Sequence, residues 1–438
     1  MAALLKNNSI LSTLLAQWPF AHIICPKIEI GLSGGVDSVV LTHLLSRLQN
    51  HLKFSLSAVY VHHGLSAHAQ DWADFCARFC LQLNIPFRVA YVELDSGSSL
   101  GIEAEARKLR YQVYFQSEAD IIALAHHQDD QVETAMLQFL RGGGPQALAA
   151  MPLLRSEQGK CLWRPLLSMT KQDMLLYAEQ NGLSFVEDES NFDEGYRRNW
   201  VRHTLLPSIK SIIPDVDNHI LRTIALMQDY VQIIHEVQDE DHAQLTVNGY
   251  FDCLKWCALS PARKKSSLLK FVQIQRLGTP RPESIEDFVF QLESALPGQQ
   301  LCWSVPNGKV YAYQNRLYPV EQGFIPAQPE LLSDINPKKM GHYRIYWQKH
   351  AQGIPRKIIE QGVVLACRQG GERIAFKNFH KTVKDCFQQQ KIPPFLRQSW
   401  PLILDKNTKS CLAIVNVQVG FFDDLTDDRF FPMLEELF

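Results

Sequence analysis

The amino-acid sequence predicts an α/β protein whose first part is a parallel β-sheet covered by helices on both faces. Strand-like and helix-like hydrophobic patterns alternate four times between Lys27 and Gly142. Helices of this length between consecutive strands imply parallel pairing and a sheet buried on both sides. The chain has 438 residues, which is too long for one compact core and favours two or three domains.

Each predicted strand is a short apolar run, and a helical pattern follows it directly. The strands are expected within residues 27–35, 56–64, 87–94 and 121–127, and the helices within residues 36–48, 69–83, 103–115 and 128–142. The last helix ends at Gly142, a typical helix-stop residue. Ligands bind such sheets at the carboxyl ends of the strands, so the functional site is expected there.

The remainder of the chain changes character and predicts further domains. Residues 208–244 have a mostly helical pattern, and residues 249–319 mix helices with short strands. Residues 324–339 are rich in Pro and Asp and are interpreted as a linker. From about residue 342, alternating patterns predict a small α+β domain. We therefore expect a catalytic domain at 1–210, a mostly helical middle domain at 211–325 and a C-terminal domain at 340–438.

Composition and charge indicate a cytoplasmic protein that does not enter a membrane. The net charge is −2, so any nucleic-acid contact must come from local basic patches. The 10 cysteines form no C-x-x-C pair, which suits a reducing compartment. The apolar first 20 residues are interrupted by Lys6 and predict an amphipathic helix rather than a signal peptide. No stretch reaches the ~18–20 apolar residues of a membrane span.

The segment from Ser33 to Ser38, SGGVDS, has the features of a phosphate-binding loop. Adjacent Gly34 and Gly35 allow a tight turn that brings backbone N–H groups close to an anion. The helix that begins at Val36 adds its dipole, and the two serines add hydroxyl donors. The spacing matches neither a Walker loop nor a dinucleotide fingerprint.

Asp37 is unexpected in such a loop, because a carboxylate repels phosphate unless a cation lies between them. We therefore expect Asp37 to bind Mg²⁺ beside a nucleotide. The alternative is a plain glycine turn in which Asp37 caps the following helix. The strand–SGGxDS–helix order within a fourfold repeat of strands and helices favours the phosphate loop.

Other polar residues follow the fourth strand and lie on two further helices. Asp130 and Glu133 share a helix face and can hold Mg²⁺ or the ammonium group of a substrate, or form only a solvated acidic helix start. His126 is a candidate for nucleotide contact or proton transfer. Arg107 and Arg110 can reach phosphate, or can pair with surface acids such as Glu103. Arg198 and Arg202 share a face suited to phosphate or RNA backbone.

These residues lie in motifs whose order resembles the tRNA(Ile)-lysidine synthetases, a family within the PP-loop ATP pyrophosphatases. The motifs are SGGVDS, VHHGLS, EAEARKLRYQVYF, AHHQDDQVETAMLQFLRGGG and DESNFDEGYRRNWVRHTLLP. The resemblance implies a Rossmann-like N-terminal domain of the adenine nucleotide alpha hydrolase type. It also implies ATP-dependent ligation of L-lysine to C2 of the wobble cytidine, position 34, of the CAU-anticodon tRNA(Ile). The products are lysidine, AMP and pyrophosphate.

The resemblance also implies roles for individual residues. Asp37, His126, Asp130, Glu133 and Arg107 are expected to be catalytic, with Mg²⁺ on Asp37. ATP is expected on Ser33, Gly34, Gly35, Val36, Asp37 and Ser38, and tRNA or other substrate on Arg110, Arg198, Arg202, Ser190 and Asn191. Two basic spans, residues 263–281 and 377–397, are expected to meet tRNA. A homodimer is left open, as is the choice of general base between His126 and a carboxylate.

Two other interpretations remain. A tRNA thiolase of the same ATP-using group would carry catalytic cysteines, and the one cysteine near the loop in sequence is Cys25, which precedes it. A non-catalytic tRNA-binding protein on the same fold would have no need of Asp37, Asp130 and Glu133 together. The sequence favours the ligase over both.

Overall fold

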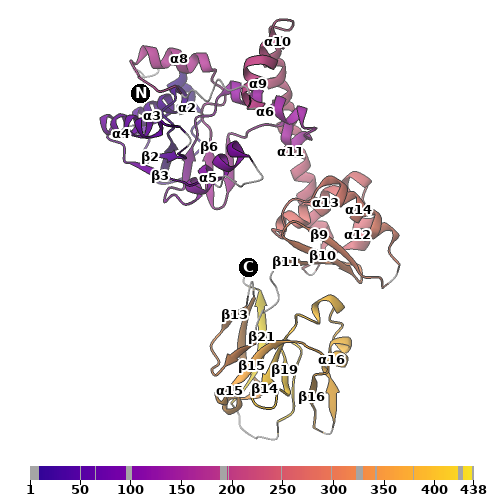
Figure 1. The fold of residues 1–438 in the computed structure, drawn as a ribbon. Coiled ribbons are helices and arrows are strands. Elements are labelled where there is room, and N and C mark those ends of the chain that lie inside the picture. The colour runs from indigo at the N-terminus through magenta and orange to yellow at the C-terminus, as the bar shows by residue number, and fades with distance from the viewer. Residues whose placement is uncertain are drawn as a thin grey trace. The chain divides into compact units, whose positions relative to one another are not determined.

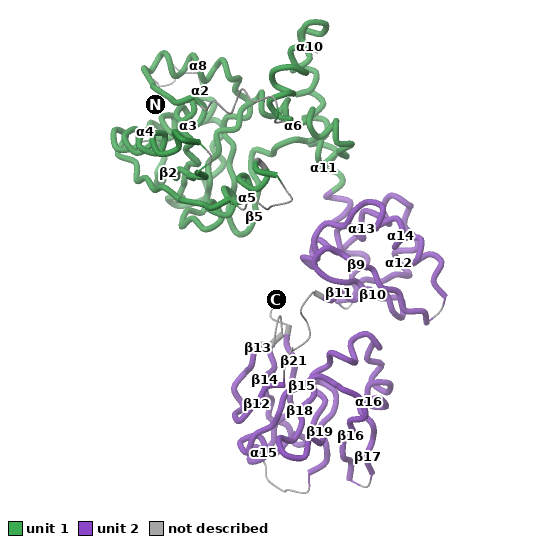
Figure 2. Tube along the Cα trace, in the orientation of Figure 1, with its two compact units in different colours: residues 1–234 green, residues 235–438 purple. Residues whose placement is uncertain are grey.

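A computed structural model describes most of the chain as two compact units, residues 1–234 and 235–438 (Figure 2). The described residues are 9–49, 51–64, 66–94, 101–187, 195, 197–247, 249–296, 298–321, 329–340, 343–377, 379–422 and 428–436. The dividing point lies inside one long helix, α11 (Val216–Leu245). The domain boundaries expected from the sequence, at 210 and 325–340, stay a prediction.

The first unit is built on one sheet, which lies among the helices around β2, β3 and β6 in Figure 1. This sheet has six strands in the order β3-β2-β1-β4-β6-β5. Its neighbouring strands are parallel except for the β5–β6 pair at one edge. The strands are β1 (Lys27–Gly31), β2 (Ser55–His62), β3 (Phe87–Tyr91), β4 (Ile121–Ala123), β5 (Leu154–Glu157) and β6 (Lys160–Trp163). The predicted parallel sheet is therefore confirmed.

Helices cover both faces of this sheet. The helices of the first unit before α11 are α2 (Ser9–Ala16), α3 (Val36–Gln49), α4 (Ala69–Gln82), α5 (Ile102–Phe115), α6 (Gln128–Leu140), α7 (Pro145–Leu148), α8 (Lys171–Gln180), α9 (Arg197–Trp200), η2 (Val201–Leu205) and α10 (Leu206–Lys210). Ile28 and Ile30 of β1 pack in one core cluster with α2, α3, α4 and α8. Val59 and Ile122 point to the opposite face and pack with α5. This alternation is the period of two that strands impose on their side chains.

Three helices begin where three strands of the sheet end, and these starts position the site. Helix α3 follows β1, α6 follows β4 and α8 follows β6. Parallel strands place all of these junctions at one edge of the sheet. Helix α6 is capped by the Asp130 carboxylate, which accepts from the His127 N–H at 3.0 Å. Helix α8 starts with a capping box between Thr170 and Asp173, an arrangement that satisfies otherwise unpaired N–H groups.

The second unit begins with α11 and continues into a five-stranded sheet packed against helices. Its elements are β7 (Thr246–Val247), β8 (Tyr250–Asp252), α12 (Cys253–Cys257), α13 (Pro261–Ile274), α14 (Pro282–Ser294), β9 (Leu301–Val305), β10 (Gly308–Tyr313) and β11 (Arg316–Glu321). Trp256, Phe271, Phe288 and Trp303 are the large side chains of its core. Within the described residues, no helix has both the length and the apolar character of a membrane span.

The C-terminal part is rich in strands, as predicted, with two short helices. Its elements are β12 (Glu330–Leu332), β13 (Lys338–Met340), β14 (Tyr343–Pro355), α15 (Arg356–Gln361), β15 (Val363–Cys367), β16 (Arg373–Ala375), β17 (His380–Thr382), α16 (Val383–Gln389), η3 (Pro394–Leu396), β18 (Pro401–Asp405), β19 (Cys411–Ile414), β20 (Gln418–Val419) and β21 (Arg429–Glu436).

The interpretation of residues 324–339 as a linker is wrong for part of the segment. Strand β12 pairs with β15, and Leu332 is buried in the core of the C-terminal part. Strand β13 pairs with β14. Pro329, Asp334 and Pro337 lie outside the two strands, so they mark turns beside short edge strands rather than an unstructured connection.

Candidate active site

A pocket of about 630 Å³ lies at the carboxyl edge of the parallel sheet in the first unit. The phosphate loop contributes Ser33, Gly35, Val36 and Asp37 to its wall. The start of α6 contributes His127, Asp129, Asp130 and Glu133, and later segments contribute Lys171, Arg202 and Lys210. Glu187 and Asp217 also line it, so one pocket combines the loop with six acidic side chains and three basic ones.

The phosphate loop has the tight turn that its glycines predict. Gly34 has φ +88°, and a Cβ placed on it would lie 2.8 Å from Val186 Cγ2. Only glycine adopts this conformation without strain. The Ser33 N–H donates to Ser38 Oγ at 3.2 Å, and Ser38 Oγ donates to the Gly35 carbonyl at 2.9 Å. The serines thus fix the turn at the start of α3.

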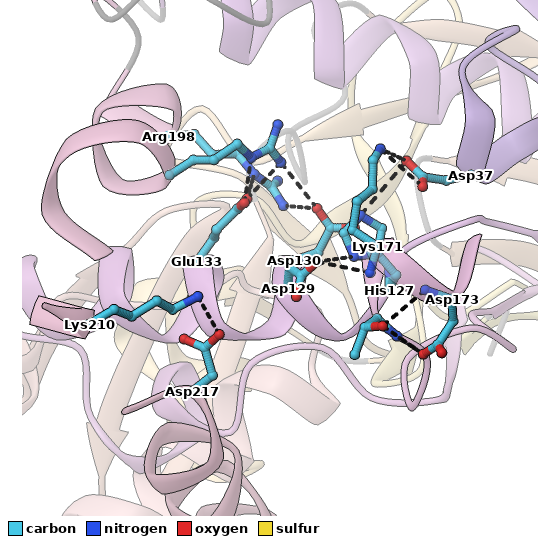
Figure 3. A network of polar contacts seen from close by, with 12 residues as sticks. Asp37, His127, Asp129, Asp130, Glu133, Lys171, Asp173, Arg198, Lys210 and Asp217 are labelled. Carbon is cyan, nitrogen blue, oxygen red and sulfur yellow. Dashed lines mark hydrogen bonds and ion pairs between the residues drawn. The ribbon is translucent and has the colours of Figure 1, made fainter. Parts of the chain in front are cut away.

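Asp37 faces two basic groups that come from distant segments. The ammonium group of Lys171 lies 2.9 Å and 3.1 Å from the two carboxylate oxygens (Figure 3). The ring nitrogen Nε2 of His127 lies 3.7 Å from Asp37 Oδ2. The Asp37 side chain is 25% exposed, so its carboxylate is accessible from the pocket. A cation therefore already occupies the position that the sequence assigns to a metal ion.

A second group of charges, the acid–arginine cluster, consists of Asp130, Glu133, Arg198 and Arg202. Arg198 donates to Glu133 at 2.8 Å and to Asp130 at 2.6 Å (Figure 3). Arg202 donates to both oxygens of Glu133, at 2.5 Å and 2.9 Å. Glu133 is only 2% exposed. Buried carboxylates are stable as ions only when such partners neutralise them.

The titration behaviour of the cluster follows from these contacts. Burial by itself would raise the pKa of Asp130, but the electrostatic interactions with His127 and Arg198 outweigh it and lower that pKa to about 2. Burial tends to lower the pKa of Arg202, and the hydrogen bonds to Glu133 raise it overall. The Asp130 carboxyl group and the Arg202 guanidinium group are therefore charged at neutral pH.

The two arginines reach the same carboxylate because of the local helix geometry. Arg198 lies in α9, and Arg202 lies in η2, a π-helical turn over Val201–Leu205. π-helical turns are rare and occur frequently at functional sites. Val201 of this turn is fully buried against Val132 of α6. This packing holds the arginine-bearing segment against the acidic face of α6.

Comparison with known proteins connects this geometry to a family. Residues 13–209 match the family described as PP-loop domain, and residues 363–426 match the TilS substrate C-terminal domain. The tRNA(Ile)-lysidine synthase of Chromobacterium violaceum is 38% identical over 417 residues, which cover 93% of this chain and 95% of that protein. The enzyme of the same name from Neisseria gonorrhoeae is 37% identical over 408 residues, 92% and 90% of the two chains. The chain belongs to the tRNA(Ile)-lysidine synthase family. The resemblance and the PP-loop fold predicted from the sequence are confirmed.

Not every residue expected to act in this lysidine synthase family member lies in the pocket wall. Arg107 and Arg110 are exposed on α5, and the Arg107 guanidinium lies over the Tyr111 ring, 5.0 Å from its centroid. His126 lies beside the pocket, and burial lowers its pKa to about 3. Its Nδ1 has no hydrogen-bond partner among the described residues. Ser190 and Asn191 fall outside the described residues.

Two pocket residues, His127 and Lys171, were not expected from the sequence. His127 is 5% exposed, and its ring lies 3.5 Å from carboxylate oxygens of both Asp129 and Asp130. The histidine pair was noticeable in the sequence, but the pattern did not show which ring faces Asp37. Lys171 follows Thr170 at a helix start, and only the fold reveals that it meets a residue 134 positions earlier.

Two buried cysteines of the first unit, Cys76 and Cys80, lack the properties that a thiolase would need. Cys76 lies beneath the loop, because a Cβ on Gly34 would come within 3.3 Å of its Sγ. Burial raises the pKa of Cys76 and of Cys80 to about 12. A thiol with such a pKa is protonated and unreactive at neutral pH.

The first basic span expected to meet tRNA is largely neutralised within the second unit. Arg263 and Lys270 pair with Asp241 and Asp239 of α11. Lys264 and Lys265 pair with Glu293 and Glu286 of α14. An RNA backbone would have to compete with these carboxylates. The role of this span stays a prediction.

Proposed function

We propose that this protein uses ATP to attach L-lysine to C2 of the wobble cytidine in a CAU-anticodon tRNA(Ile), which yields lysidine, AMP and pyrophosphate. One observation carries this proposal: the pocket that joins the phosphate loop to Asp130, Glu133 and Arg202 of the acid–arginine cluster. Membership of the tRNA(Ile)-lysidine synthase family supports the ATP-dependent ligase activity. Each half of the pocket suits one of the two small substrates.

The half of the pocket formed by the phosphate loop suits a nucleoside triphosphate. Backbone N–H groups at the start of α3 and the helix dipole favour an anion at Ser33–Gly35. Asp37 would hold Mg²⁺, because the ion is usually bound by one or two carboxylates together with substrate phosphates. The residues fit, since the accessible carboxylate already accommodates the Lys171 ammonium group at 2.9 Å. When bound, Mg²⁺ would neutralise charge on the phosphates.

The cluster half suits an amino acid. Free lysine carries a carboxylate and an ammonium group on one carbon, and the cluster offers two guanidinium groups beside two carboxylates. Arginines form bidentate pairs with carboxylates, and Asp130 and Glu133 can accept from an ammonium group. Lysine would bind by exchanging partners within the cluster, so no buried charge would be left unpaired.

The proposed reaction has two steps whose atoms balance. The C2 oxygen of the cytidine attacks the α-phosphorus of ATP, the bond to the β-phosphate breaks, and pyrophosphate leaves. The ε-amine of lysine then attacks C2, the C2–O bond breaks, and AMP leaves with the bonding electrons while nitrogen gives up a proton. A pKa of about 3 makes His126 a weak base, so it suits a hydrogen-bonding role better than proton abstraction. The same argument applies to Asp130, whose pKa is about 2.

The tRNA must present an unstacked base, because C2 is inaccessible within a stack. An anticodon loop offers such a base. The match of residues 363–426 to the TilS substrate C-terminal domain supports a role of the second unit in holding tRNA. We infer a cytoplasmic location, which a tRNA substrate and free cysteines support.

One assay tests the proposal. The purified protein is incubated with ATP, Mg²⁺, radiolabelled lysine and total bacterial tRNA. We expect label on RNA, with AMP and pyrophosphate formed in equal amounts, and nuclease digestion should place the label on a single nucleoside. Label that does not reside on a single nucleoside, or the absence of label while ATP stays intact, would refute the proposal.

A further inference from the structure

Lys171 is the basic residue of the pocket that lies closest to the phosphate loop, and no role has yet been assigned to it. Its ammonium group contacts both oxygens of Asp37, which is the residue proposed to hold Mg²⁺. A lysine ammonium and Mg²⁺ cannot share the same side of one carboxylate, because like charges at that distance repel strongly. If Mg²⁺ binds Asp37, Lys171 must therefore take another position.

The backbone of Lys171 is fixed while its side chain is free to move. Its N–H donates to Asp129 Oδ2 at 3.0 Å. The preceding residue, Thr170, is held in the capping box with Asp173. The Lys171 side chain is 45% exposed, and four rotatable bonds give its ammonium group a wide reach. The residue can change partner without any movement of α8.

The next partner is defined by the other residues of the pocket wall. Ser33, Gly35 and Lys171 line the same pocket, so a triphosphate on the loop would bring its anionic oxygens near Lys171. An ion pair between partly exposed groups is weak. A divalent ion on Asp37 and a phosphate beside it would therefore displace the existing pair readily.

We propose that Lys171 is a phosphate-binding residue that changes partner during nucleotide binding. It neutralises Asp37 in the nucleotide-free pocket and moves to the β- and γ-phosphates when Mg²⁺ binds Asp37. The exchange keeps every charge paired in both states. It also stabilises the pyrophosphate leaving group, and in this respect the inference rests on the proposed function.

The first test compares nucleotide binding by calorimetry. The ligand is an ATP analogue with a methylene group between the α- and β-phosphorus, in excess Mg²⁺, and AMP is the second ligand. Lys171→Met should weaken analogue binding about tenfold, as expected for a lost charge-assisted hydrogen bond, and should change AMP binding less than twofold. Lys171→Arg should keep binding within about threefold of wild type, since it retains the charge. Equal or tighter binding of the analogue to Lys171→Met would overturn the proposal.

The second test measures the other half of the exchange. Mn²⁺, a paramagnetic substitute for Mg²⁺, is titrated into nucleotide-free protein and followed by electron paramagnetic resonance. Lys171→Met should bind Mn²⁺ several times more tightly than wild type, because Asp37 is no longer neutralised. Unchanged or weaker Mn²⁺ binding would show that Lys171 does not compete for Asp37.

A matched control variant separates local from general effects. Lys108→Met removes another half-exposed lysine that pairs with a carboxylate, Glu105, on α5 outside the pocket wall. It should leave analogue and Mn²⁺ binding unchanged. The lysine-transfer assay on wild type is independent of both titrations. Its failure would remove the proposed function, whereas a failed titration would remove only the role of Lys171.

Discussion

The phosphate loop and the acid–arginine cluster meet at one pocket, which Asp130, Glu133 and Arg202 of the cluster line, but the two are assembled in different ways. The loop is a single run of six residues, Ser33–Ser38, and its binding groups are mainly backbone N–H groups at a helix start. The cluster joins two carboxylates of α6 to two guanidinium groups that lie 65 to 69 residues further along the chain. The loop has one charged side chain, and the cluster has four.

Because of this difference, substitutions in the loop and in the cluster should affect activity and stability to different extents. The Asp37 carboxylate is partly exposed, so the fold does not depend strongly on it, whereas Glu133 is buried between two arginines. Loss of a loop side chain should therefore affect nucleotide chemistry and leave the fold intact. Loss of a cluster side chain should affect both, because an unpaired buried charge is costly.

The largest effect is expected in the loop, from Asp37→Asn. The variant should keep its fold and its tRNA affinity, while adenylation should fall at least about 1,000-fold, because the metal-binding carboxylate is lost. ATP–pyrophosphate exchange in the presence of tRNA measures adenylation, and filter binding measures tRNA affinity. Normal exchange by this variant would contradict the role of Asp37.

The cluster should respond to Glu133→Ala with a loss of stability of about 3 kcal/mol, since Arg198 and Arg202 would lose their shared partner. Urea unfolding measures this loss. In the surviving folded protein, the KM for lysine should rise more than the KM for ATP. Glu157→Ala, which removes a more exposed partner of Arg155, should cost less than about 0.5 kcal/mol. Equal increases in the two KM values would count against a lysine site at Glu133.

The effect of an alanine substitution in the phosphate loop can be compared with the effect of the same substitution in an open turn. Gly34→Ala combines a positive φ with a close approach to Val186, while Gly159→Ala has φ +77° and open space around the new Cβ. Gly159→Ala should cost about 1 kcal/mol of unfolding free energy, and Gly34→Ala about 2 kcal/mol together with weaker nucleotide binding. Equal costs in urea unfolding would show that the packing around Gly34 is loose.

The same contrast explains what the sequence could and could not predict. The loop is local, so its strand, turn and helix could be predicted from consecutive residues. The spacing of Asp130 and Glu133 correctly placed both on one helix face, because helical geometry is also local. Their arginine partners depend on the packing of η2 against α6, which is a tertiary contact. The two carboxylates could be placed on one helix face, and so could the two arginines, but the ion pairs between carboxylates and arginines could not be predicted.

The same limit accounts for His127 and Lys171. Both lie at helix starts, where side chains ordinarily serve as caps, and Asp130 and Asp173 indeed supply capping oxygens there. Helix capping alone accounts for polar residues at these positions, so the sequence does not indicate the contact with Asp37. The interpretation of residues 324–339 failed for a related reason, since proline and aspartate between short strands resemble an unpaired linker until β12 meets β15.

The smallest effect concerns His126 beside the cluster, and it tests whether a neutral imidazole is required there. Burial lowers the pKa of His126 from 6.5 to about 3, so the folded state resists protonation while the unfolded state accepts a proton below pH 6.5. Stability is then fully present above pH 6.5 and decreases as the pH falls towards 3. Between pH 7 and 5.5 the protonation equilibrium of His126 should lower the free energy of unfolding by about 1 kcal/mol.

Urea unfolding of wild type and His126→Gln at both pH values measures this loss of stability, and the variant should lose that part of the pH dependence. His51→Gln, at an exposed position, should keep it. If His126→Gln retained the full slope, the acid sensitivity would originate outside the cluster, and the buried imidazole would be no more protected than a surface one.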